Sequence, residues 1–73
     1  MEEILLSAGF IDKGLCAVCG GRARRFEKTI NGRPAVCTIK AQQMSKFVLR
    51  FGSEIIRGDA SNLDHILTIR GLK

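Results

Sequence analysis

The chain has 73 residues, of which 45% are hydrophobic and 26% are charged, and this ordinary globular balance excludes disorder along the whole length. Its net charge of +5, from twelve basic and seven acidic residues, favours a polyanionic partner, although it also suits a face that only keeps the protein in solution. Three cysteines are an odd and sparse set, which excludes a secreted disulfide scaffold and indicates a cytoplasmic protein with reduced thiols.

We predict one small domain over residues 1–73, without a linker. A chain this short buries only about 60% of the surface that its unfolded form exposes, so a metal, a disulfide or a partner chain usually stabilises it further. No apolar run approaches the ~20 residues of a membrane helix, and we therefore expect no membrane partner.

The first segment, residues 1–8, carries two glutamates followed by three aliphatic residues. The carboxylates suit the positive end of a helix dipole, although the run fits a short strand equally well. Gly9 ends the segment, and residues 12–14 have the composition of a turn.

Cys16 and Cys19 form a Cys-x-x-Cys pair that two glycines follow. Two cysteines at this spacing reach one ion from a tight turn, and glycine permits the positive φ that such a turn needs. Residues 15–21 resemble the knuckle of zinc-ribbon and treble-clef modules. The resemblance implies Zn²⁺ as a cofactor, and the candidates for the two remaining ligands are Cys37 and His65.

The zinc site leaves alternatives open. Cys37 falls in a predicted strand at some distance from the Cys-x-x-Cys pair, so a second subunit could supply the missing ligands instead. Alternatively, all three cysteines are small buried residues that pack in the core and carry no chemistry.

Asn31 and Gly32 form the strongest hairpin signal in the chain and predict a central β-hairpin over about residues 22–40. A type I′ turn there fixes a register in which Phe26 faces Cys37. One face of the hairpin is then apolar and consists of Phe26, Ile30, Ala35, Cys37 and Ile39. The other face is mostly polar and consists of Arg25, Glu27, Thr29, Pro34, Val36 and Thr38.

The segment after the hairpin is ambiguous. Apolar residues recur at helical spacing and Gly52 follows them as a stop, which favours a helix over about residues 40–51. Residues 47–51 nevertheless have the composition of a strand. A possible short third strand covers about residues 54–57.

The C-terminal segment predicts a helix over about residues 61–70. Ser61 and Asp64 form a capping-box pattern at its start, and Gly71 follows as a stop. The hairpin, the possible third strand and the two helices together predict an α+β fold.

Five basic residues gather in the hairpin segment and are the candidate nucleic-acid-binding set: Arg22, Arg24, Arg25, Lys28 and Arg33. A two-stranded ribbon fits the major groove of DNA, and contacts to phosphates need only positive charge and donors. We therefore expect a small regulatory module that contacts nucleic acid, or a nucleic-acid-associated protein, through an arginine-rich hairpin. No catalytic arrangement is evident, and we expect no enzyme activity.

The alternative is an adaptor or inhibitor that docks on another protein, or on its own copy as a homodimer, through apolar helix surfaces. The residues that would form this surface are Met44, Phe47, Phe51, Ile66 and Ile69.

Overall fold

The computed structural model describes residues 2–18, 21–40 and 45–73, without the side chains at 16–18, 21 and 22. Its elements are α1 (Glu2–Ser7), β1 (Ile11–Val18), β2 (Gly21–Ile30), β3 (Arg33–Lys40), β4 (Lys46–Phe51), β5 (Glu54–Asp59) and α2 (Ala60–Ile69). Among the described residues, no helix is long and apolar enough to cross a membrane.

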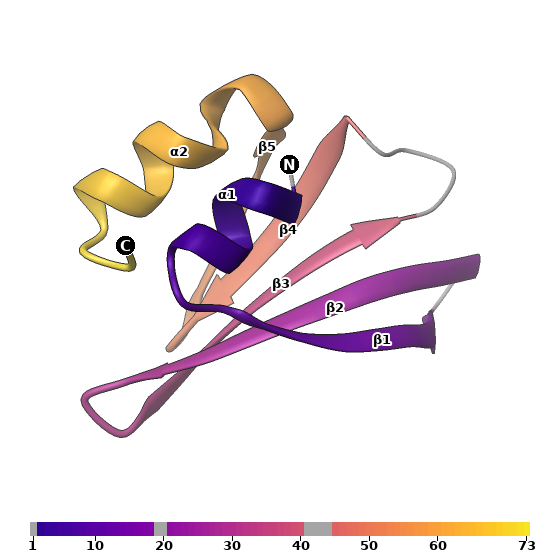
Figure 1. Ribbon diagram of the computed structural model, residues 1–73, viewed down its shortest axis with the longest axis horizontal. Helices are drawn as coiled ribbons and strands as arrows, with labels where there is room; N and C mark the ends of the chain where they lie inside the picture. Colours follow the sequence, from indigo (N-terminus) through magenta and orange to yellow (C-terminus); the bar gives the residue numbers. More distant parts are fainter. Residues whose placement is uncertain (1, 19–20, 41–44) are drawn as a thin grey trace.

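The strands form one antiparallel sheet in which neighbours in sequence are neighbours in space, in the order β1-β2-β3-β4-β5. The helices from the two ends of the chain, α1 and α2, lie over the same face of this sheet (Figure 1). The opposite face of the sheet is not covered by either helix.

The hydrophobic core lies between the helices and the sheet. Alternation along β3 and β4 buries every second side chain, because successive residues of a strand point to opposite faces. The helices contribute Leu5, Leu63 and Leu67 to this core, and all three side chains are fully buried. The sheet contributes Phe26, Ala35, Cys37, Ile39, Phe47 and Leu49.

The predicted hairpin register is confirmed residue for residue. Phe26 pairs with Cys37 across β2 and β3, and the backbone turns at Asn31 and Gly32 with φ angles of 52° and 79°. The C-terminal helix is confirmed, and the fold is a five-stranded antiparallel sheet with two helices, which is mostly β and agrees with the α+β class in outline. The N-cap of α2 is Asp59, however, and not Ser61 as the capping-box pattern predicted.

The predicted helix over residues 40–51 is wrong, because residues 46–51 form β4. Phe47 and Leu49 point into the core, whereas Arg50 points to the uncovered face, and β4 pairs with strands on both sides. The helical spacing had relied in part on residues 41–44, which lie outside the described residues. The possible third strand over 54–57 is longer than predicted and is the fifth strand of the sheet.

The N-terminal third of the chain also differs from the prediction. Residues 11–18 form β1, so the Cys-x-x-Cys segment lies at the end of a β1–β2 hairpin. The predicted turn over residues 12–14 is a bulge within β1, where the side chain of Asp12 accepts a hydrogen bond from the Gly14 amide at 2.8 Å. This bulge interrupts the ladder on an edge strand, as is common at sheet edges.

Candidate anion-binding face

Two of the predicted nucleic-acid-binding residues lie on the face of the sheet that the helices cover. Arg24 forms ion pairs with Asp12, at 2.8 Å, and with Glu2, at 3.5 Å. Lys28 donates hydrogen bonds to the carbonyl oxygens of Ala8 and Leu72. Arg24 thus connects β2 to α1 through Glu2, and Lys28 connects β2 to the residue after α1 and to the C-terminal segment. Both basic residues therefore contribute to the stability of the fold.

The other predicted basic residues are dispersed. Arg25 points to the uncovered face but pairs with Glu27 at 2.7 Å. Arg33 is exposed beside the turn between β2 and β3. The side chain of Arg22 lies outside the described part of the structure. The structure therefore does not gather the predicted set on one surface.

A different basic surface lies on the uncovered side of β2 to β5, which we call the open face. The strand registers place its basic members, Arg25, Lys40, Lys46, Arg50 and Arg57, on the same side of the sheet. Its acidic members are Glu27 and Asp59, and each is paired with a basic neighbour of the same face. Among the described residues, no carboxylate forms an ion pair with the remaining cations, Lys40, Arg50 and Arg57.

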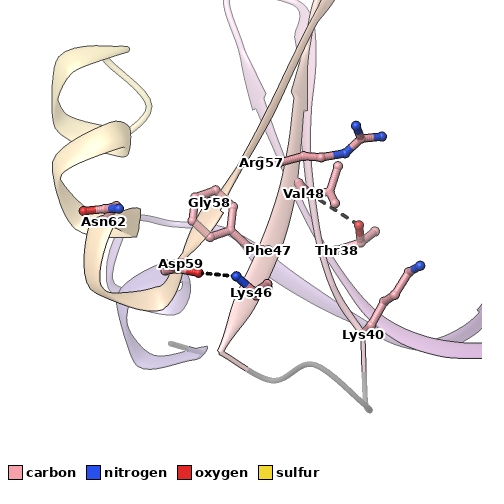
Figure 2. Close-up of a pocket in the computed structure, with 9 residues that line it drawn as sticks. All are labelled: Thr38, Lys40, Lys46, Phe47, Val48, Arg57, Gly58, Asp59 and Asn62. Atoms are coloured by element: carbon pink, nitrogen blue, oxygen red, sulfur yellow. Dashed lines mark hydrogen bonds and ion pairs between the residues drawn. The ribbon is translucent and has the colours of Figure 1, made fainter.

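One hollow on this surface, the Arg57 hollow, has a volume of about 430 Å³. It lies where β3 ends, β4 begins and β5 runs into α2, and it is lined by Thr38, Lys40, Lys46, Phe47, Val48, Arg57, Gly58, Asp59 and Asn62. Figure 2 shows Arg57 and Val48 projecting to the side of the sheet away from α2, whereas Asn62 comes from α2. Lys46 and Asp59 point toward one another and are 2.8 Å apart.

A second hollow, the Arg50 hollow, has a volume of about 390 Å³ and lies toward the other end of the open face. It is lined by Arg33, Pro34, Val36, Arg50 and Gly52. Each hollow is thus lined by at least one arginine and by one valine, Val48 in the Arg57 hollow and Val36 in the Arg50 hollow. The guanidinium groups offer hydrogen-bond donors and positive charge to an oxyanion.

All four aromatic side chains of the protein lie away from the open face. Phe10, Phe26 and Phe47 are almost fully buried, and Phe51 packs against the core on the side of the helices. Phe47 reaches the wall of the Arg57 hollow, but only 2% of its surface is exposed. The open face therefore presents no aromatic ring on which a nucleic acid base could stack.

The structure separates two of the predicted metal ligands, Cys16 and Cys37. Cys16 pairs with Ala23, whereas Cys37 is on β3 opposite Phe26. Two strand spacings and three residues separate the Cys16 and Cys37 backbones, or roughly 14 Å. Because zinc–sulfur bonds are only about 2.3 Å long, these two cysteines do not share one ion.

The other two candidates are His65 and Cys19. His65 is exposed on α2, and Cys19 lies outside the described residues. Cys37 is buried in the core, and this burial raises the pKa of its thiol to about 12. Within the ranges that the structure describes, no group of three or more His, Cys, Asp or Glu is placed to hold a metal ion. Zinc at the Cys-x-x-Cys pair stays a prediction.

Sequence reasoning missed Lys40, Arg50 and Arg57 as members of one surface. The missed signal was the alternation of apolar and basic residues over 46–51. Interpreted as a strand, that alternation places Lys46, Val48 and Arg50 on one face, and the same reasoning adds Arg57 from β5. Comparisons with protein-family models, with curated proteins and with solved structures found no significant match to this chain.

Proposed function

We propose that this chain is a non-catalytic binding module whose open face holds the phosphate backbone of a nucleic acid. The observation that carries the proposal is the exposure of Lys40, Arg50 and Arg57 on one uncovered sheet face, where the acidic residues Glu27 and Asp59 pair with two other basic residues of that face. Contacts of this kind require charge and donors but no reading of bases.

The chemistry of the hollows supports an oxyanion as the ligand. A guanidinium group presents a fork of donors that matches phosphate oxygens, and each hollow has an arginine at its rim. The Arg57 hollow is also lined by Thr38, whose hydroxyl donates to the carbonyl oxygen of Val48 at 3.5 Å, and by Asn62 from α2. The proposal includes a cytoplasmic location, because an odd number of cysteines and a core thiol suit a reducing compartment.

The test is the salt dependence of binding to a fluorescent 20-base-pair DNA of mixed sequence. The logarithm of affinity falls linearly with the logarithm of salt concentration, with a slope of about −0.9 for each phosphate contact. We expect Lys40→Ala combined with Arg57→Ala to flatten this slope by about two contacts without changing the far-ultraviolet spectrum.

Lys73→Ala combined with Arg70→Ala is the matched control, because it removes the same charge from exposed side chains that pair with acidic residues outside the open face. An equal loss of affinity in both double variants would show that net charge, and not the open face, determines binding. That result would overturn the proposal.

The second candidate function is docking on a protein partner or on a second copy. Its predicted surface is mostly occupied, because Phe47 is buried and both Phe51 and Ile66 pack against the core. Met44 lies outside the described residues. Ile69, with 62% of its surface exposed, is the member of this predicted surface that still favours the alternative. Outside that surface, Leu6, Ile11, Leu15 and Ile55 are exposed as well. Sedimentation of the purified protein measures whether it self-associates.

A further inference from the structure

We infer that the open face accepts the backbone of a B-form DNA duplex in preference to a single strand. This inference rests on the proposed function and names the class of nucleic acid that the surface would take. It follows from the location of the aromatic residues, from the spacing of the hollows and from the rigidity of the strands that carry the cations.

The first step is the absence of a stacking surface. Proteins that bind single strands without sequence preference combine a basic groove with aromatic side chains on which bases stack, at about 1–3 kcal/mol per base. The protein has four Phe and neither Trp nor Tyr, and every Phe lies in or against the core. A single strand would therefore expose its bases to a surface of valine, isoleucine, proline, threonine and charged side chains, which offers no aromatic ring.

The second step is the distance between the hollows. Arg50 lies in the row of Val36 in the Arg50 hollow, and Arg57 lies in the row of Val48 in the Arg57 hollow. Two residues of β4 separate these rows, or about 7 Å at the rise of an extended strand. Phosphates on one strand of B-DNA follow one another every ~3.4 Å along the helix axis, so the two guanidinium groups are spaced to contact phosphates of one strand.

The third step is preorganisation. Arg50 and Arg57 project from adjacent strands that pair along their whole length, so their backbone positions are fixed before any ligand arrives. A duplex is equally rigid, and two rigid arrays of matching spacing associate without a large ordering cost. A flexible strand would lose conformational entropy on the same surface and would gain no stacking in return.

The experiment compares three labelled probes of one mixed sequence: a 20-base-pair DNA duplex, either of its separated strands and the corresponding RNA duplex. At equal nucleotide concentration and equal salt, we expect the DNA duplex to bind about ten-fold more tightly than the single strand, the factor that one lost stacking contact represents. We also expect weaker binding to the RNA duplex, because A-form RNA has a deep and narrow major groove.

A gain-of-function variant tests the physical reason. Val36→Phe adds an aromatic ring to the open face, and we expect it to tighten single-strand binding about ten-fold through stacking. Ile69→Phe is the matched control, since it adds the same ring to an exposed position on α2, and it should leave single-strand binding unchanged.

The outcomes separate the inference from the function on which it rests. If none of the probes binds at low salt, the proposed function fails. If the single strand or the RNA duplex binds as tightly as the DNA duplex, the function stands and the inference of a B-form duplex is overturned. A Val36→Phe variant with unchanged single-strand affinity would also overturn the stacking argument.

Discussion

Gly32 shows how one residue fixes the register of the central hairpin. Its φ angle of 79° lies in the left-handed region, as does the 52° of Asn31, and the side chain of a β-branched residue is poorly tolerated there. We expect Gly32→Val to destabilise the protein by about 1–2 kcal/mol, which lowers the melting temperature of a domain this size by roughly 5–15 °C. Calorimetry measures the change.

Thr29→Val is the control for Gly32→Val, since it introduces the same side chain at an exposed strand position of the same hairpin. Valine is favourable in strands, so this control should retain or slightly raise the melting temperature. If the two variants melt alike, the positive φ at Gly32 does not constrain the residue.

Cys37 is a second residue whose behaviour follows from its surroundings. Burial raises the pKa of its thiol from 9.0 to about 12, so at pH 8 the native protein holds almost no thiolate at this position. We expect a thiol reagent to leave Cys37 unmodified in native protein and to modify it in urea, as peptide mass analysis would show. Rapid native modification at pH 8 would contradict a buried thiol.

The same shift has a consequence for stability at high pH. The unfolded thiol loses its proton near pH 9, whereas the folded thiol keeps it until about pH 12. The native state therefore binds more protons across this interval, and the stability that Cys37 contributes is lost as pH rises from about 9 to about 12. A Cys37→Ala variant should lack this part of the alkaline decline in urea unfolding.

At the scale of the elements, Lys28 joins the two ends of the chain to the sheet. Its ammonium group donates to the carbonyl oxygen that follows α1, at Ala8, and to the one that follows α2, at Leu72. Hydrogen bonds from a charged donor contribute about 1.5–3 kcal/mol each, and partial exposure reduces this value. We expect Lys28→Met to lower the unfolding free energy in urea by about 1–3 kcal/mol.

The control for Lys28→Met is Lys13→Met, which makes the same substitution at an exposed position on the edge strand β1. Hydrogen exchange adds a local measurement, because loss of the Lys28 contacts should accelerate exchange in α1 and in the last residues more than in β3. If exchange in the Lys28 variant accelerates by the same factor in α1, in the last residues and in β3, the two ends of the chain do not depend specifically on this lysine.

The elements also show what a sequence can predict. The Asn-Gly turn and the C-terminal helix were predictable because each is specified by local residues: positive φ at two turn positions and apolar spacing closed by Gly71. The structure of residues 46–51 was not predictable, because the spacing of apolar residues in so short a segment fits a helix and a strand equally well. Only the pairing with β3 and β5 shows that the segment is a strand.

The location of the candidate site depended on whether residues 46–51 form a helix or a strand. Arg50 and Arg57 come to one face only when β4 and β5 are both strands in their observed register, so the alternation over residues 46–51 was not sufficient by itself to place them together. Arg24 and Lys28 had the right charge and the right hairpin, but the even positions of β2 point toward the helices. Their ion pairs and hydrogen bonds depend on where α1 and the C-terminal segment pack, which is a tertiary property.

At the scale of the whole molecule, the proposed function assigns folding to one face of the sheet and binding to the other. The covered face holds the core and the contacts that fasten the chain ends, whereas the open face carries cations on a surface without aromatic rings. Substitutions on the open face should therefore change binding and leave folding intact. Those on the covered face should change folding first.

Leu72 tests this division from the covered side, because it belongs to the core although it lies beyond the last helix. Its side chain is fully buried, and its amide donates to the carbonyl oxygen of Leu67 at 2.9 Å. Replacing a buried leucine by alanine costs about 2–5 kcal/mol, a large share of the unfolding free energy of roughly 5 kcal/mol expected of a domain this small.

We expect Leu72→Ala to be partly unfolded at 37 °C, whereas Lys73→Ala, at an exposed neighbour, should melt as the unmodified protein does. Circular dichroism during heating measures both, and a Leu72→Ala variant of unchanged melting temperature would show that the core closes without the C-terminal segment.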